Sequence, residues 1–591
     1  MAAAIEALDI AKDRHNLWMQ LVAIGLASSV TKYLPEHEEQ RFDMLAMAIQ
    51  LLEVVTRMPE AFRPPLRYEI ALRVLLSELL EEQGEISKAE DLVQQALARH
   101  PRFGSDQPWV IWAKLAQYAQ MQGNNELARA HLLQARQAVM DIVTQVEVES
   151  DPFALMVDKD HLQDVMADEF LKAYRENKIS AADLCLVADF QASVVLSRHL
   201  SLHWKPEGYE AMLANPLVDS GEEQLRQFVT HETSSDEKIG ILQAFEASSG
   251  VYLFLIEISP SFISSQLLPL RLESNAINQL THQTSFRLAQ YRLAQKSDPL
   301  EQIAGWREFV SALRSSVSSC ISPGTHLCIV PGPLSGLPLQ IALGQDYPLN
   351  YAPSLAVAHL LHHRRLQMKE GPRWRPSSVH DFVVWRVGER PEIIEHFQSA
   401  SVALEADLST LGIQYAHTSG VAGTREALFR ALQMSECVRL SCHGRVRTEN
   451  LRFELLVAAD NQLPPTDASA LDSERGQQFL VNWQAITKLP QCAPLVFSTA
   501  CASGMAISLR GGERIGLERP LFSAGTVTYV APLWPVPVAQ IQPLINRIMT
   551  KYIRNPQKTI ADVVFEEVNA AVAEGVPSWV ARSVTVLGDW L

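Results

Sequence analysis

Apolar side chains recur at helical spacing along the first 145 residues, with almost no runs of β-branched residues. This spacing predicts amphipathic helices that each bury one face. Gly84 and Gly123 both follow one apolar stretch and precede a polar bend and a second stretch, so we expect two helix–turn–helix pairs. Small residues stand five and twelve positions after each glycine, at Ala89, Ala96, Ala128 and Ala135. Side chains of this size let paired helices approach closely.

The offsets of these small residues resemble the consensus of the tetratricopeptide repeat (TPR). The two glycines are 39 positions apart, so about five residues are inserted around Phe103 relative to the 34-residue repeat. The alternative is a plain helical bundle in which the alanines fall at these positions by chance. Stacked repeats present a concave surface to other proteins. Residues 1–145 are therefore predicted to form a TPR-like domain that binds protein.

The hydrophobic pattern changes after about residue 236. Residues 146–235 look helical and amphipathic, and we interpret them as a packed connector. Beyond them, helical segments alternate with short apolar runs: Gly250–Ile258, Leu327–Pro331, Asp381–Trp385, Val438–Ser441, Leu495–Ser498 and Val527–Val530. This order is typical of a mostly parallel sheet buried on both faces. It predicts an α/β domain over residues 236–591.

Composition and charge narrow the classes of protein that fit. The 591-residue chain has 47% hydrophobic residues, 20% charged residues and a formal net charge of -16, which argues against direct nucleic-acid binding. The seven cysteines include no CxxC pair, so neither a zinc ribbon nor a disulfide scaffold is supported. The N-terminus lacks a signal-peptide pattern, and no uncharged apolar stretch of about 18 residues exists. We expect a reducing, cytoplasmic location, no membrane association, and no metal or cofactor.

Two short motifs near the C-terminus place reactive side chains where predicted strands end. His443 follows Leu440-Ser441-Cys442, and Cys501 follows Val496-Phe497-Ser498-Thr499-Ala500. In an open α/β sheet, functional groups gather at the carboxyl ends of the strands. A cysteine and a histidine brought together there form a nucleophile–base pair. Taken singly, a cysteine at a strand end is more often a small buried hydrophobe.

The motifs of the α/β region, taken in order, resemble those of the CHAT domain, a caspase-like fold related to caspases, separases and gingipains. The matching segments are Val330–Leu334, Tyr351–Ser354, Gly423–Ala427, Ser441–Gly444, Phe497–Gly504 and Leu533–Val536. The resemblance implies a cysteine endopeptidase with a catalytic dyad, in which His443 is the base and Cys501 the nucleophile. It also implies an oxyanion hole made by the backbone amides of Gly444 and Cys501. No Asp or Asn is evident as a third member, so we expect a dyad.

The resemblance further implies limited proteolysis of one dedicated protein target. The TPR-like repeats would sense a protein activator or recruit the substrate. Bacterial CHAT proteins of this layout act in anti-phage defence or regulated cell death, for example by activating a gasdermin-like effector. Two alternatives stay open: a non-catalytic scaffold or adaptor that keeps a protease-like fold, and a separase-like protease in another pathway.

One departure from the family concerns substrate preference. Many relatives carry acidic residues just after the tryptophan-containing strand, but Leu533–Gln540 has no carboxylate. A charged side chain next to the cut bond would be buried there without a partner, which is costly. We predict a neutral or apolar residue at that substrate position (P1), although Asp460, Asp472 or Glu513 could supply charge from another loop.

Several other residues near these motifs are interpreted as structural. Cys437, Cys442 and Cys492 are assigned to the core, and His417 to a structural role. His362 is placed on a solvated helix face. The segment 444–481 is rich in turn formers and is predicted to be a loop beside the site.

Overall fold

The structure is a computed structural model of the chain. It describes residues 19–20, 23, 47–50, 52–54, 57, 66–99, 108–145, 160–180, 184, 188–189, 238–259, 263–270, 272–290, 299–368, 374–447, 452–500, 503–504, 506–508 and 514–589. The chain divides into two compact units, Met1–Val146 and Glu147–Leu591, and each is described by itself.

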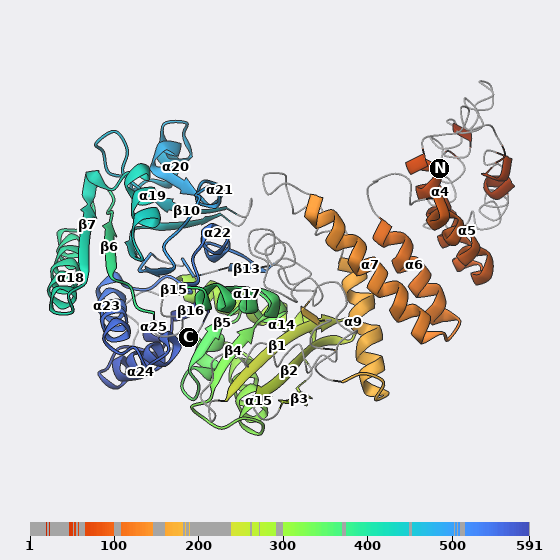
Figure 1. The fold of residues 1–591 in the computed structure, drawn as a ribbon, viewed down its shortest axis with the longest axis horizontal. Helices are drawn as coiled ribbons and strands as arrows, with labels where there is room; N and C mark the ends of the chain where they lie inside the picture. The colour runs from red at the N-terminus through yellow and green to blue at the C-terminus, as the bar shows by residue number, and fades with distance from the viewer. Residues whose placement is uncertain are drawn as a thin grey trace. The chain divides into compact units, whose positions relative to one another are not determined.

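The first unit contains two described helical hairpins, as the spacing of apolar residues predicts (Figure 1). Its helices are α4 (Leu66–Glu82), α5 (Ile86–Arg99), α6 (Pro108–Met121) and α7 (Asn125–Gln145). Gly84 and Gly123 both have a φ of 78°, a left-handed conformation that glycine adopts without steric cost. The four alanines at the predicted offsets have no exposed surface. The assignment of these hairpins to the TPR family stays a prediction.

The second unit is built on an eleven-stranded sheet. In spatial order its strands are β3 (Ile263–Leu267), β2 (Gly250–Ile258), β1 (Ile239–Ala247), β4 (His326–Val330), β5 (Leu349–Tyr351), β16 (Val584–Gly588), β15 (Thr528–Pro532), β12 (Leu495–Ser498), β8 (Cys437–Ser441), β6 (Ser378–Val383) and β7 (Gln414–Ser419). Neighbours from β15 to β7 are parallel, and so are neighbours from β1 to β16. The two blocks meet at β15 and β16, which are antiparallel. The predicted mostly parallel sheet is confirmed.

Helices cover the sheet of the second unit (Figure 1). Helix α19 (Arg425–Met434) contacts β6 and β8, and α23 (Val538–Arg554) contacts β12. Helix α18 (Pro391–Thr410) contacts the edge strand β7, and α22 (Glu518–Ala524) contacts β15 and β16. Thr424 caps α19 by accepting a hydrogen bond from the Ala427 N–H, as the sequence predicts. All residues of β8 and β12 are buried, so both strands hold their carboxyl ends rigidly.

Five strands of the large sheet lie outside the predicted apolar runs, for identifiable reasons. One of them, β3, is an edge strand whose residues are half-buried or exposed. β1 carries Gln243 and Glu246 within its apolar run, and β7 is an edge strand with a largely polar sequence. β5 has only three residues. β16 follows directly after the short helix α25 (Ser578–Ala581), without a turn signal such as Gly or Pro between them. Edge and short strands bury too little surface to need a strong apolar pattern.

Two local predictions are wrong. His362 is buried on α17 (Leu355–Leu366), where its Nδ1 lies 3.1 Å from Asp589 Oδ1, a partner 227 residues away that local pattern could not reveal. The segment 444–481 is not a loop. It forms a three-stranded antiparallel sheet of β9 (Gly444–Arg447), β10 (Arg452–Leu456) and β11 (Leu480–Asn482), with α20 (Ala468–Asp472) in the connection from β10 to β11.

Among the described helices, none is both long and apolar enough to cross a membrane.

Candidate active site

His443 lies just past the carboxyl end of β8, and hydrogen bonds hold the backbone around it. The carbonyl of Ser441, the last residue of β8, accepts a hydrogen bond from the Val384 N–H at 2.9 Å. The carbonyl of His443 itself accepts one from the Leu456 N–H at 2.9 Å. Gly444 then begins β9 in extended conformation, which any residue can adopt. A need for glycine at this position would therefore come from a lack of space for a Cβ atom.

The register of the sheet places the strands that precede the two sequence motifs side by side. β8 and β12 are parallel neighbours, with Leu440 opposite Ser498. Counting three positions onward along each chain leads to His443 and Cys501. Cys501 itself lies outside the described residues.

The chain on both sides of position 501 is held by hydrogen bonds to buried groups. Ser498 Oγ accepts from the Ala500 N–H at 3.1 Å and from the Ser503 hydroxyl at 2.8 Å. The Ser503 carbonyl accepts from the Tyr529 hydroxyl at 3.2 Å. The Gly504 N–H donates to the Pro532 carbonyl at 2.9 Å. One serine therefore bonds both Ala500 and Ser503.

A glutamate contacts the Nε2 atom of the His443 ring. His443 Nε2 lies 2.9 Å from Glu389 Oε2, with the side chains 23% and 13% exposed. Because a carboxylate can only accept, Nε2–H donates, which leaves Nδ1 as the nitrogen with a lone pair. The sequence analysis missed Glu389, which lies 54 residues before His443. The available signal was its position just beyond β6, the strand parallel to β8 on the other side from β12.

The electrostatic surroundings keep the His443 ring neutral near pH 7. Burial lowers the pKa of His443 below its ordinary value, and the positive charge of Arg386 lowers it further, while Glu389 partly opposes both. Arg386 Nε lies 3.9 Å from Glu389 Oε2. A neutral imidazole with a free Nδ1 lone pair is ready to accept a proton, which is the first task of a general base.

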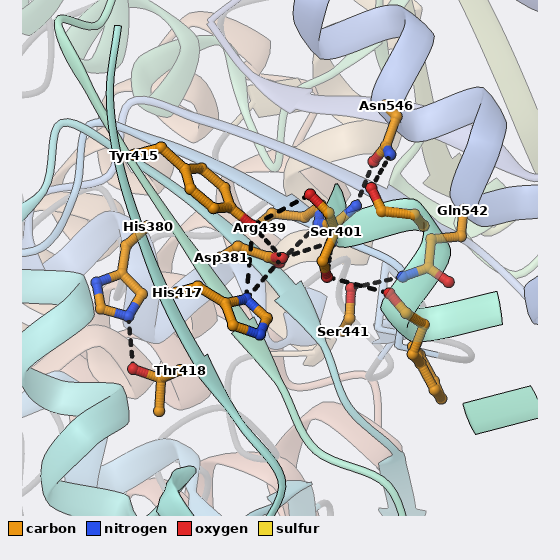
Figure 2. A network of polar contacts seen from close by, with 12 residues as sticks. His380, Asp381, Ser401, Tyr415, His417, Thr418, Arg439, Ser441, Gln542 and Asn546 are labelled. Atoms are coloured by element: carbon orange, nitrogen blue, oxygen red, sulfur yellow. Dashed lines mark hydrogen bonds and ion pairs between the residues drawn. The ribbon is translucent and has the colours of Figure 1, made fainter. Parts of the chain in front are cut away.

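A buried ion pair lies beneath this edge of the sheet (Figure 2). Arg439 of β8 bonds Asp381 of β6 in two places, Nε–Oδ1 at 2.8 Å and Nη2–Oδ2 at 2.7 Å. Burial alone would raise the pKa of Asp381, but Arg439 and the hydrogen bond from His417 hold it well below its usual range. Tyr415 also donates to Asp381, at 2.9 Å. His417 therefore has a structural contact, as predicted.

The ends of β8 and β12 are also tied to each other. Ser441 Oγ accepts hydrogen bonds from the Thr499 hydroxyl at 3.1 Å and from Gln542 of α23 at 3.4 Å. Figure 2 shows Ser441 and Gln542 next to the ion pair of Arg439. The polar network thus links both strands that lead to the proposed catalytic residues with one helix behind them.

The described cysteines other than Cys320 are core residues. Burial raises the pKa of Cys328, Cys442 and Cys492 to about 12, and it raises that of Cys437 as well. The prediction that Cys437, Cys442 and Cys492 belong to the core is confirmed. A thiol with such a pKa carries almost no thiolate at neutral pH, so it is chemically inert.

The residues considered for substrate charge have mixed outcomes. Trp534 is buried and donates to the Trp579 carbonyl at 3.1 Å. Asp472 is paired with Arg445 at 2.7 Å, while Glu513 lies outside the described residues. Among the residues that the structure describes, no group of three or more His, Cys, Asp or Glu side chains is placed to hold a metal.

The comparison with protein families finds one similarity, within the second unit. Residues 310–564 match the family model described as the CHAT domain. This part of the chain is similar to a CHAT domain. The matched range includes Glu389, His443 and Cys501. No curated protein matches the sequence.

Solved structures give weak likenesses to this chain. Two chains from crystal structures of the Saccharomyces cerevisiae separase–securin complex are similar to it, at 3.0 and 2.6 Å resolution. They are 9% and 10% identical, with TM-scores of 0.43 and 0.45. The alignments cover 97% and 99% of this chain but only 50% and 48% of those chains, so this chain spans about half their length.

Proposed function

We propose that this chain is a cysteine endopeptidase that cuts a dedicated protein target. The observation that supports it best is the pairing of His443 Nε2 with the Glu389 carboxylate at 2.9 Å, at a strand end whose register leads to Cys501. That arrangement directs the basic Nδ1 away from the carboxylate. The CHAT-domain match over both motifs agrees with this role.

The proposed reaction begins with acylation of the cysteine. His443 Nδ1 takes the proton of the Cys501 thiol, and the sulfur forms a bond to the carbonyl carbon of the substrate peptide. The electron pair of the C=O bond moves to oxygen, where the amides of Gly444 and Cys501 donate hydrogen bonds to it. Removing one such donor typically costs about 2.7–4 kcal/mol of transition-state stabilisation. The intermediate collapses as the C–N bond breaks, and the imidazolium gives its proton to the leaving amine.

Hydrolysis of the thioester repeats these steps with water as the nucleophile and the cysteine sulfur as the leaving group. His443 takes a proton from water, and the hydroxide forms a bond to the acyl carbon. Collapse of the second intermediate breaks the C–S bond, releases the acid and regenerates the thiol. Glu389 acts in both halves, because its negative charge stabilises the imidazolium that forms each time. It is a positioning residue, since it touches His443 and not the substrate.

The helical hairpins of the first unit support regulation by another protein. We propose that they act as TPR-like repeats that recruit the target or an activator. Defence against phage, through release of a toxic effector, is the setting that fits a dedicated target of a TPR–CHAT chain.

Co-expression tests the proposal. The parent and Cys501→Ala are each expressed with the proteins encoded beside this chain, and the products are separated by mass. The proposal predicts one discrete cut that depends on Cys501. Cleavage that persists in Cys501→Ala, or no cleavage of any candidate, would leave the scaffold as the better account.

A further inference from the structure

A pocket lies close to the proposed active site, beside the segment that carries Glu389. Its volume is about 370 Å³, within the range of about 300–1,000 Å³ that is usual for sites that enclose a ligand. Val387 forms one wall, and the connection between β10 and β11 forms the others. Val387 and Glu389 are two residues apart, so their Cα atoms are separated by at most about 7.6 Å. One short segment therefore lines the pocket with Val387 and contacts His443 with Glu389.

The wall of the pocket is bonded to the chain on both sides of the active site. The Val387 N–H donates to the Pro464 carbonyl at 3.0 Å, and the Thr466 hydroxyl donates to the Val387 carbonyl. On the other side, Arg445, two residues past His443, pairs with Asp472 of α20 at 2.7 Å. A group that enters the pocket thus contacts Val387, which lies in the same segment as Glu389, the partner of His443.

The lining of the pocket favours an uncharged apolar group. Two of its polar side chains bond their own chain: Asp467 accepts from the Ser469 N–H at 2.9 Å and from the Ser469 hydroxyl at 2.7 Å, and the Ser473 hydroxyl donates to the Ala470 carbonyl at 2.6 Å. The charges of the lining residues cancel, with one acid and one arginine. Its apolar members are Val387, Leu463, Pro465, Ala470 and Phe479. Val387 is 53% exposed, so it gains from being covered.

We propose that this pocket takes an aliphatic or aromatic side chain of the protein substrate. The inference rests on the proposed endopeptidase function and adds to it a site that selects the target. Because an extended chain rises about 3.3 Å per residue, the residue bound here lies within a few positions of the cut bond. Burial of a leucine side chain is worth about 1.5–3 kcal/mol. That corresponds to a preference of roughly 13- to 160-fold over an exposed side chain.

Affinity selection with a random heptapeptide library tests the pocket without requiring catalysis. The full chain carrying Cys501→Ala is the bait, alone and with a second change. Val387→Lys places a positive charge in the pocket. Val402→Lys is the matched control, because Val402 is 66% exposed on α18 and does not line the pocket.

The pocket predicts three results. The Cys501→Ala chain enriches aliphatic or aromatic residues at one peptide position, Val387→Lys replaces them there with Asp or Glu, and Val402→Lys leaves the profile unchanged. No enriched position, or the same profile with Val387→Lys as without it, would overturn the pocket assignment. The selected peptides are then offered to the parent chain. Binding without cleavage would refute the endopeptidase and leave the pocket standing, whereas cleavage with an unchanged Val387→Lys profile would do the opposite.

Discussion

Replacing Glu389 tests how the histidine is held and charged. Glu389→Gln keeps the shape of the side chain and can still accept the Nε2–H bond, but it removes the negative charge. A hydrogen bond between charged groups contributes about 1.5–3 kcal/mol, and a neutral one about 0.5–1.5 kcal/mol. Unit charges at the observed 2.9 Å interact by about 1.4 kcal/mol even at the dielectric constant of water. The charge of Glu389 is therefore worth about 1–1.5 kcal/mol to the imidazolium.

That magnitude translates into a loss of turnover. Glu389→Gln should lower kcat about 5- to 13-fold, and Glu389→Ala about 13- to 160-fold. KM should change little in both variants, because the side chain at position 389 does not touch the substrate. Glu389 raises the pKa of His443 against burial and Arg386. Its removal lowers that pKa further, so the acid limb of the kcat–pH profile moves to lower pH.

The assay measures kcat and KM from about pH 5 to pH 8, on the target that co-expression identifies. Glu392→Gln is the control, because Glu392 is an exposed residue in the first turn of α18. A kcat for Glu389→Gln within twofold of the control, or an acid limb that stays in place or moves to higher pH, would refute the reasoning.

Three further predictions follow from contacts around the site. Arg386→Gln removes a charge that lowers the pKa of the neighbouring imidazole, so the acid limb should move to higher pH in the same assay. Ser498→Ala leaves two donors unpaired and should cost about 1–3 kcal/mol in urea unfolding, whereas Ser319→Ala, at an exposed helix end, should change stability by less than about 0.5 kcal/mol. Arg439→Met leaves the buried carboxylate of Asp381 without its ion-pair partner and should lower the free energy of unfolding by about 3–5 kcal/mol. Adding Asp381→Asn should recover most of that loss. No recovery in the double variant would show that the ion pair is not the cause.

Local pattern predicted the parts of the fold that bury continuous apolar runs. Strands β2, β4, β6, β8, β12 and β15 all coincide with predicted runs. The helix capped by Thr424 begins where predicted. In these segments, propensity and burial favour the same structure, so the sequence alone was sufficient.

Long-range polar contacts were beyond the reach of local pattern. Glu389 meets His443 only because β6 and β8 are parallel neighbours. His362 meets Asp589, which lies 227 residues later in the sequence, inside the core. Neither pairing leaves a periodic trace, since each depends on the order of strands in the sheet. Once that order is known, the residues just beyond the ends of neighbouring parallel strands are where partners for a catalytic histidine should be sought.

The most direct test of the central claim is the reactivity of the Cys501 thiol toward iodoacetamide at pH 7, measured for each cysteine by peptide mass spectrometry. An ordinary thiol is only a few per cent thiolate at this pH, and a neutral imidazole within reach of a thiol can take its proton as the sulfur attacks. Cys501 should therefore react at least about fivefold faster than the partly exposed Cys320, and His443→Ala should abolish the difference. Equal rates for Cys501 and Cys320 in the parent, or an advantage that survives His443→Ala, would contradict the account.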